Sequence, residues 1–319
     1  MKLKCAILDD YQQVALTLAD WLVIADRVEV FSFSQHFSDE VELAVHLQDC
    51  DIVVVMRERT PMTATLLARL PKLKLLITSG MRNASIDLAA AARHGIIVSG
   101  TASGSAAPME LSWALLLGLA KHLVPENHGL RHNGPWQQAV GVTLQGKTLG
   151  LLGLGKIGSQ MAVVAQAFGM RVLAWSQNLT AERAGEVGAT RAESKQALFE
   201  QSDFVSIHLV LSERSRGLVG QPELQAMKKT AYLINTSRAA IVDRSALIDV
   251  LQQEQIAGAG LDVFEIEPLP ADDIFRHLPN VLATPHLGYV ADSNYQIYFR
   301  EAIENIEAFI AGVPLRRLG

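Results

Sequence analysis

Short apolar runs alternate with helix-like segments along the whole chain. In the first third, the runs predict strands at 5–10, 28–33, 51–56, 73–80 and 95–100. The segments 63–70 and 87–95 between them have the composition of helices. Because strands that alternate with helices form parallel sheets covered on both faces, the pattern predicts an α/β fold.

A second series of strands follows the first and predicts a second sheet. Its members are predicted at 147–155, 171–176, 204–210, 231–237, 256–264 and 280–286. A long helix is predicted between the two series over 105–122, and an amphipathic helix over 291–312 follows the second series. The 319 residues exceed what one hydrophobic core normally serves, so we expect two doubly wound parallel-sheet domains.

The charge and cysteine content exclude several classes of protein. The chain has 28 basic and 33 acidic residues without a long block of one sign, so nucleic acid is not an expected partner. The longest apolar stretch, 111–120, is about half of what a bilayer requires, so no membrane span is expected. Cys5 and Cys50 have no ligand-like spacing, which predicts no metal site and fits a cytoplasmic location.

A glycine fingerprint follows the first strand of the second series. Gly153, Gly155 and Gly158 have the G-x-G-x-x-G spacing between an apolar strand and a helix. In this context the first glycine allows a tight turn, the second admits a pyrophosphate close to the backbone, and the third lets the helix pack against the strand. The segment therefore predicts a dinucleotide site.

The end of the next strand bears on which dinucleotide is bound. A carboxylate there would select NAD, and an arginine would attract the extra phosphate of NADP. This chain has the neutral residues Ser176 and Gln177 instead, and the nearest cation in sequence is Arg183. NAD and NADP both remain open, with NAD slightly favoured because no arginine follows the strand directly.

Three later strands end in residues suited to hydride transfer. Arg238 lies in INTSRAAIVD, Glu267 in GLDVFEIEP and His286 in TPHLGY. Reduction of a 2-oxo acid needs a cation for the carboxylate, an acid for the carbonyl oxygen, and a carboxylate that keeps this acid charged. Arginine, histidine and glutamate are these residue types, so we predict catalysis by Arg238, Glu267 and His286.

The combination of GLGKIG, NTSRAAIVD, AGLDVFEIEPLP and TPHLG resembles the D-isomer-specific 2-hydroxyacid dehydrogenases over nearly the whole chain. The resemblance implies that Arg238 binds substrate, that Glu267 pairs with His286, and that His286 is the acid/base. The cofactor positions that we assign are Gly153, Gly155, Lys156, Ile157, Gly158, Ser176, Gln177, Thr236, Asp262 and Gly288. The substrate positions are Arg57, Gly80, Met81, Arg82, Arg238 and His286.

The resemblance also implies a domain layout and an assembly. Residues 1–99, completed by 290–319, are expected to form a flavodoxin-like substrate-binding domain. Residues 100–289 are expected to form a Rossmann dinucleotide-binding domain. The family further suggests a homodimer.

The sequence departs from the family pattern at three places. Arg82 and Asn83 replace the usual glycine-rich and acidic residues of the first-domain turn, which leaves the identity of the substrate open. Ala239 follows Arg238 where the family usually has glycine, and Ser176 replaces the usual ribose-binding aspartate. None of these changes affects the three predicted catalytic positions.

The expected reaction is the reversible reduction of a small 2-oxo acid, such as a glyoxylate, hydroxypyruvate or phosphoglycerate-like compound, to the (R)-2-hydroxy acid. Formate dehydrogenases share the fold but replace the glutamate by an amide, so Glu267 argues against that activity. A phosphonate-oxidising relative keeps all three residues and remains an alternative. A cofactor-sensing, corepressor-like binding module is a second alternative, less favoured because such proteins usually carry extended tails.

Overall fold

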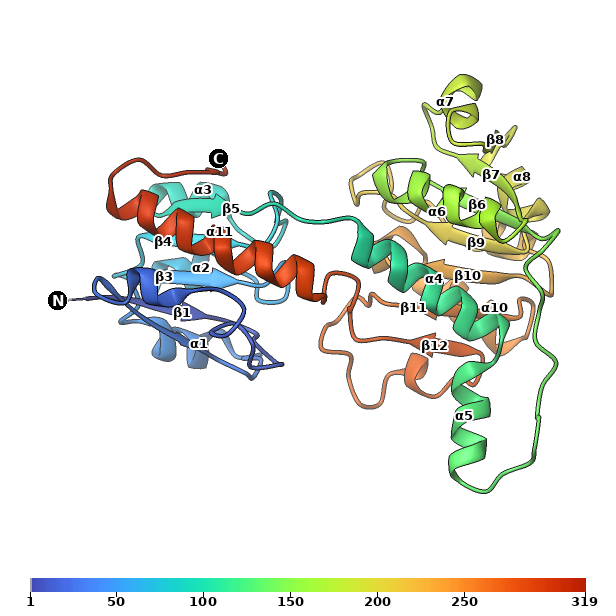
Figure 1. Cartoon of the computed structure of the whole chain (residues 1–319), viewed down its shortest axis with the longest axis horizontal. Coiled ribbons are helices and arrows are strands. Elements are labelled where there is room, and N and C mark those ends of the chain that lie inside the picture. Colours follow the sequence, from blue (N-terminus) through green and yellow to red (C-terminus); the bar gives the residue numbers. More distant parts are fainter. Residues whose placement is uncertain (1) are drawn as a thin grey trace. The chain divides into compact units, whose positions relative to one another are not determined.

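The computed structural model describes residues 2–319 and divides the chain into two units. The first unit runs to Gly104 and also contains Val290–Gly319. The second unit is Ser105–Tyr289. Each unit is built on its own parallel sheet (Figure 1).

The sheet of the first unit has the flavodoxin-like order that the sequence predicted. Its strands lie in the order β2-β1-β3-β4-β5, and all neighbours are parallel. These strands are β1 (Leu3–Ile7), β2 (Val28–Ser32), β3 (Ile52–Val55), β4 (Leu75–Thr78) and β5 (Ile97–Gly100). The residues of β3 and β4 are buried throughout, as expected for strands with helices on both faces.

Helices cover the two faces of this sheet. Residues of α1 (Glu40–Leu47), α2 (Ala64–Ala68) and α3 (Leu88–Arg93) share one hydrophobic core with alternate strand residues. The long C-terminal helix α11 (Asp292–Ile310) packs against β4 and the short helix η1 (Trp21–Ile24), and it lies across the sheet in Figure 1.

Buried polar side chains of α11 bind the backbone that leaves β5. The Asn305 side-chain amide donates to the carbonyl of Gly100 at 2.9 Å, and a Glu301 carboxylate oxygen accepts from the amide of Ala102 at 2.7 Å. Residues 100–104, which the sequence assigned to the second domain, therefore lie with the first unit. These hydrogen bonds avoid the free-energy penalty of burying a backbone carbonyl or amide without a hydrogen-bond partner.

The second sheet has the Rossmann order, as the sequence predicted. Its strands lie in the order β12-β11-β10-β9-β6-β7-β8, and all neighbours are parallel. These strands are β6 (Thr148–Leu152), β7 (Arg171–Trp175), β8 (Thr190–Arg191), β9 (Phe204–Ile207), β10 (Tyr232–Asn235), β11 (Gly258–Leu261) and β12 (Val281–Ala283). The two-residue strand β8 is the one that the sequence pattern did not predict.

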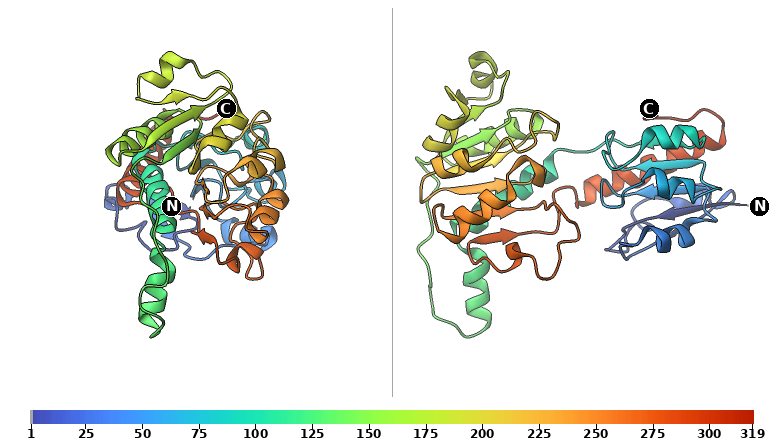
Figure 2. Two further views of the ribbon diagram at one scale, coloured as in Figure 1. Left: turned by 90° about the vertical axis from the view of Figure 1, so that its right-hand side faces the viewer. Right: turned by 180° about the vertical axis from the view of Figure 1, so that it is seen from behind.

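The second sheet also has helices on both faces. The helices α4 (Ala106–Ala120) and α6 (Lys156–Ala167) share one hydrophobic core with it. On the other face, α8 (Lys195–Gln201), α9 (Gln221–Ala226) and α10 (Arg244–Gln252) enclose a second core, and the view from behind in Figure 2 shows this layer. The remaining short helices are α5 (Leu123–Arg131), α7 (Ala181–Gly185), η2 (Ala239–Ile241) and η3 (Ile274–Arg276).

The helix predicted over 105–122 ends earlier than expected. Its last helical residue is Ala120, and His122 adopts a left-handed φ of 52°, after which α5 begins. A left-handed residue interrupts the series of helical hydrogen bonds, so the chain changes direction there. Within residues 2–319, no helix is long and apolar enough to cross a membrane.

The bond from Asn305 to Gly100 leads to a prediction about stability. Replacing Asn305 by alanine leaves a buried carbonyl without its donor, so we expect Asn305→Ala to lower the free energy of unfolding by about 1–3 kcal/mol. Urea unfolding followed by circular dichroism measures this change. Gln296→Ala, on the exposed face of the same helix, is the matched control, and an equal loss in both variants would contradict the argument.

Candidate active site

The glycine turn (residues 153–158) joins β6 to α6 and has the geometry of a phosphate-binding turn. Gly153 has a left-handed φ of 103°, and a Cβ atom there would lie 2.5 Å from the carbonyl oxygen of His208. A Cβ atom on Gly158 would lie 2.2 Å from the Gly153 carbonyl oxygen. Both positions therefore require glycine, because any side chain would collide with the backbone.

Gly155 differs from the other two glycines because it faces open space. No heavy atom lies within 4 Å of a Cβ placed there. Gly155 is also the residue before α6, and no side chain caps the first amides of that helix. Open space beside uncapped helix amides fits the pyrophosphate of a dinucleotide, with the exposed cation Lys156 as the next residue.

His208 supports this turn and carries no charge. It follows β9, and its ring nitrogen Nε2 lies 2.8 Å from the hydroxyl of Ser206. Burial lowers the pKa of His208 to about 4, because a desolvated imidazolium is unfavourable. We conclude that His208 is a packing residue beneath the glycine turn rather than a cation for the phosphates.

The end of β7 is neutral, as the sequence indicated. Ser176 and Gln177 follow Trp175 directly, and the amide of Leu179 donates to the carbonyl of Ser176 at 3.1 Å, which turns the chain towards α7. Arg183, the nearest cation in sequence, lies in the first turn of α7 (Ala181–Gly185).

The three predicted catalytic residues lie at the carboxyl ends of neighbouring strands. Arg238 follows β10, Glu267 lies in the loop after β11, and His286 follows β12. Because these strands pair in parallel and in that order, their carboxyl ends meet at one edge of the sheet.

Glu267 and His286 are in direct contact. The Glu267 Oε2 atom lies 2.6 Å from the His286 Nδ1 atom, and Oε1 of the same carboxylate accepts from the amide of Phe264 at 2.8 Å. Both side chains are partly buried, with 24% of Glu267 and 15% of His286 exposed. A carboxylate at this distance makes Nδ1 the donor, which leaves Nε2 for proton exchange.

Asp262 fixes the segment that carries His286. This fully buried carboxylate accepts from the Thr284 hydroxyl at 2.6 Å, from the Leu287 amide at 2.7 Å and from the Gly288 amide at 2.8 Å. Burial raises the pKa of Asp262, and the hydrogen bonds from Thr284 and the two amides oppose that effect. His286 itself adopts a left-handed φ of 53°, so the bonds to Asp262 hold a strained position.

Asn235 orients Arg238, although the sequence did not single it out. Its side-chain amide donates to the carbonyl of Arg238 at 3.1 Å, and its oxygen accepts from the amide of Ser237 at 3.0 Å. The sequence feature that could have identified Asn235 is its position as a polar residue at the end of a buried apolar strand. Thr236 is held similarly, because its hydroxyl lies 2.7 Å from the hydroxyl of Ser112 on α4.

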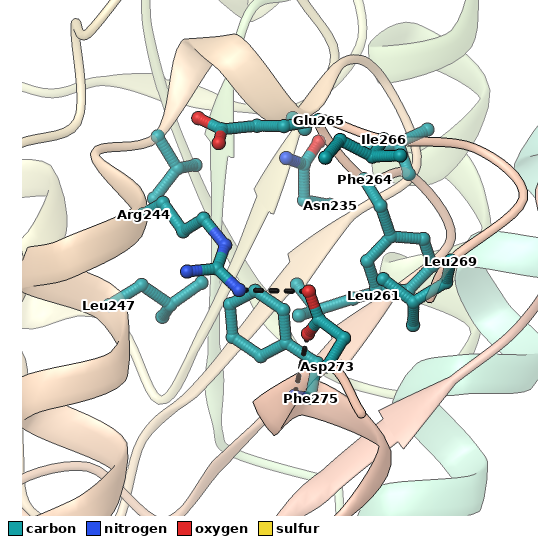
Figure 3. Close-up of a pocket in the computed structure, with 13 residues that line it drawn as sticks. Asn235, Arg244, Leu247, Leu261, Phe264, Glu265, Ile266, Leu269, Asp273 and Phe275 are labelled. Atoms are coloured by element: carbon teal, nitrogen blue, oxygen red, sulfur yellow. Dashed lines mark hydrogen bonds and ion pairs between the residues drawn. The ribbon is translucent and has the colours of Figure 1, made fainter. Parts of the chain in front are cut away.

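A cavity of about 310 Å³ lies in the second unit beside the loop that carries Glu267 (Figure 3). Its wall includes the ion pair between Arg244 and Asp273, with an N···O distance of 2.8 Å, and Asn235 contributes to the same lining. The lining of this cavity includes none of the three predicted catalytic residues, Arg238, Glu267 and His286. Because the predicted catalytic residues do not contribute to its wall, we do not assign the reaction to this cavity.

The four predicted substrate residues of the first unit lie together within that unit. Arg57 follows β3 with a left-handed φ of 56°, and its amide donates to the Ser79 hydroxyl at 2.9 Å. Gly80 follows β4, and a Cβ atom there would lie 2.3 Å from Nη1 of Arg57, so glycine allows the guanidinium to lie over the turn. Met81, 46% exposed, and Arg82 come next.

A second polar cluster at this edge of the first sheet was missed by the sequence reasoning. Asp9 is buried and accepts from the Thr60 hydroxyl at 2.7 Å, and it lies 3.0 Å from Nδ1 of His36. The Arg59 guanidinium lies 4.7 Å from the ring centre of Tyr11. The sequence feature that could have identified this cluster is the acidic pair at the end of the first strand, Asp9 and Asp10.

In residues 2–319 no three histidine, cysteine or acidic residues are grouped to hold a metal ion.

Comparisons with known proteins identify the family to which this chain is similar. Residues 113–288 match the NAD binding domain of the D-isomer specific 2-hydroxyacid dehydrogenases. A glyoxylate reductase from Aeropyrum pernix is 39% identical over 256 residues, which cover 77% of this chain and 76% of the relative. A D-3-phosphoglycerate dehydrogenase from Synechocystis is 33% identical over 288 residues, 87% of this chain and 51% of the relative, so this chain spans about half of that protein.

A solved structure extends the similarity to both units. The crystal structure of a phosphoglycerate oxidoreductase from Vibrio cholerae O395 aligns with a TM-score of 0.91 at 40% identity, covering 97% of this chain and 99% of that one. The match therefore includes the two sheets as well as the sequence motifs. The chain belongs to the D-isomer specific 2-hydroxyacid dehydrogenase family and is an NAD(P)-dependent oxidoreductase that acts on the CH–OH group of 2-hydroxy acids.

Proposed function

We propose that this enzyme reduces a small 2-oxo acid of the glyoxylate, hydroxypyruvate or phosphoglycerate-like type to the (R)-2-hydroxy acid, and catalyses the reverse reaction. The observation that carries this proposal is the 2.6 Å contact between Glu267 and His286, with Arg238 on a neighbouring strand end. The relatives named glyoxylate reductase and D-3-phosphoglycerate dehydrogenase support this range of substrates.

The three side chains have separate tasks in the proposed reaction. Arg238 binds the substrate carboxylate through paired hydrogen bonds, which orients the carbonyl group. His286 donates a proton from Nε2 to the carbonyl oxygen, and Glu267 holds the imidazolium in orientation and balances its charge. The reduced nicotinamide, when bound, supplies the hydride. In the reverse direction, neutral His286 accepts the proton of the hydroxyl group.

We assign the dinucleotide to the second unit, which also supplies Arg238 and His286, and we assign further substrate-binding residues to the first unit. The second unit binds the dinucleotide, with the pyrophosphate beside Gly155 and the nicotinamide close to Asp262. The full proposed set for the cofactor is Gly153, Gly155, Lys156, Ile157, Gly158, Ser176, Gln177, Thr236, Asp262 and Gly288. The first unit contributes Arg57, Gly80, Met81 and Arg82 to substrate binding, and their common position at one sheet edge supports this assignment.

We also propose that the enzyme is a cytoplasmic homodimer. Large apolar side chains are exposed on α5 and the following loop, with Trp136 79% exposed, and such a patch is typical of a protein interface. The other members of this patch are Leu123, Val124, Leu130 and Val140. Both cysteines are free and buried, which is compatible with a reducing compartment.

A substrate panel tests the proposed reaction. Glyoxylate, hydroxypyruvate, pyruvate and 3-phosphohydroxypyruvate are each mixed with the enzyme and NADH or NADPH, and the loss of absorbance at the nicotinamide band is followed. Turnover of at least one 2-oxo acid, with the (R)-hydroxy acid as product, is expected. Binding of a dinucleotide without turnover of any of them would instead favour the binding-module alternative.

The contact between Glu267 and His286 predicts the effect of removing the acid. His286→Ala is expected to lower kcat by about 10²–10⁴-fold and to leave the dissociation constant for NADH within about twofold, because His286 acts on the substrate carbonyl. Steady-state kinetics and NADH fluorescence titration measure the two quantities. His277→Ala, an exposed histidine of the same unit, is the control, and normal turnover by His286→Ala would identify another proton donor.

The open space beside Gly155 predicts a separation of binding from stability. Gly155→Ala is expected to unfold at the wild-type temperature, because its Cβ meets no protein atom within 4 Å. It is expected to bind NADH about tenfold more weakly or worse, because the methyl group occupies the pyrophosphate position. Gly185→Ala, which also meets no atom, is the matched control for both measurements. Wild-type affinity in Gly155→Ala would show that the pyrophosphate lies elsewhere.

A further inference from the structure

The end of β7 has no charged group to select between the two cofactors, and the nearest cation in sequence, Arg183, lies on α7. Between Ser176 and α7 the chain makes one turn, and the hydroxyl of Thr180 then accepts from the amide of Arg183 at 3.2 Å. This cap sets the direction in which α7 begins. Arg183 is thereby placed on a helix that starts only a few residues after the position where the ribose-binding residue is expected.

The side chain of Arg183 extends from α7 to the dinucleotide helix α6. Its Nη2 atom donates to the hydroxyl of Ser159 at 2.9 Å. Ser159 lies in the first turn of α6, and its own amide donates to the carbonyl of Gly155 at 2.9 Å. Four residues of helix rise about 6 Å, so this contact holds the guanidinium about one helical turn from Gly155.

The charges around Arg183 leave it available to an anionic ligand. Its Nη1 atom pairs with Glu186 at 2.6 Å, but the two side chains are 43% and 63% exposed. An exposed pair of this kind contributes little free energy, so the Glu186 side chain can rotate into solvent. A phosphate offers a higher charge and more acceptor oxygens than a carboxylate, and a guanidinium binds it through paired hydrogen bonds.

The other charged groups nearby are compatible with a phosphate. Lys156, the first residue of α6, is an exposed second cation. Glu182 hydrogen-bonds to its own backbone amide and to Thr180; these bonds lower the pKa of Glu182 and hold its carboxylate at the start of α7. Ser176 carries no charge, so the strand end does not repel a phosphate.

We propose that Arg183 is the cation that binds the 2′-phosphate of NADP(H) in this enzyme. An arginine directly after β7 would attract the phosphate of NADP, and this chain has none there. The positive charge is supplied instead from α7, by the Arg183 side chain, which Ser159 positions beside the first turn of α6. This inference rests on the proposed function in one respect, the binding of the dinucleotide along the glycine turn. It makes Arg183 a residue that determines cofactor specificity and takes no part in proton transfer.

Binding without turnover tests the inference. The dissociation constants of NADPH and NADH are measured by fluorescence, and those of adenosine 2′,5′-bisphosphate and 5′-AMP by calorimetry. Arg183→Ala is expected to weaken NADPH and the bisphosphate about 10–100-fold while NADH and 5′-AMP change by less than about threefold. Arg171→Ala is the matched control, because Arg171 is an exposed arginine at the opposite end of β7. This variant should change none of the four dissociation constants.

A second variant is expected to act in the opposite direction. Glu186→Gln removes the carboxylate that competes for the Arg183 guanidinium, so NADPH should bind severalfold more tightly while NADH is unaffected. The two variants together separate phosphate binding from a general effect on α7, because a structural defect would weaken both dinucleotides in both variants.

The outcomes distinguish this inference from the proposed function. Unchanged NADPH affinity in Arg183→Ala, or an equal loss for NADH and NADPH, overturns the assignment of Arg183. Wild-type enzyme that binds NADH and 5′-AMP but not the bisphosphate overturns it as well, and leaves the proposed function intact. Wild-type enzyme that binds neither dinucleotide overturns both.

Discussion

Parallel pairing of β10, β11 and β12 is the constraint on which the candidate active site depends. Asn235 pairs with Leu261, and Leu261 pairs with Ala283, so the three strands end level with one another. Residues that follow these strands within a few positions are therefore delivered to one edge, although more than forty residues separate the first from the last. A slip in the pairing of β12 would separate His286 from Glu267, because each residue adds about 3.3 Å along a strand.

Hydrogen bonds to a buried carboxylate stabilise the same edge. An isolated carboxylate in a protein core is very unfavourable, and Asp262 is fully buried. Its hydrogen bonds to Thr284, Leu287 and Gly288 compensate for the lost hydration, and they form only when the chain turns back after β12. The left-handed backbone of His286 lies inside this turn, so the cost of its conformation is offset by bonds made by its neighbours. The desolvated carboxylate thus fixes the backbone at His286, the residue that we propose as the acid, through its neighbours Thr284, Leu287 and Gly288.

The sequence was sufficient for features that have a local signal. The strands were predictable because buried parallel strands are continuous apolar runs. The positions of Arg238, Glu267 and His286 after three of these strands were predictable because each residue follows such a run, and their catalytic roles stay a prediction. Contacts between residues distant in sequence had no such signal. The acidic pair after the first strand marked Asp9 but not its partners Thr60 and His36. These contacts, like the bond from Arg183 to Ser159, depend on how far a side chain reaches across the fold, which neither spacing nor composition encodes. The boundary near residue 100 was displaced for the same reason, since Glu301 and Asn305 act on it from the other end of the chain.

Placing the selective charge on α7 rather than at the end of β7 has a consequence for the unliganded and NAD-bound states. A guanidinium that protrudes without a counter-charge would favour the phosphate of NADP but would be uncompensated when that phosphate is absent. In this enzyme Glu186 pairs with Arg183 in the free protein, and under our proposal the phosphate takes its place when NADP binds. Each state then contains one pair, so the two cofactors differ in free energy only by the difference between a phosphate and an exposed carboxylate as partners. Such an exchange produces a graded preference between the cofactors, whereas an aspartate at the strand end would exclude NADP by repulsion.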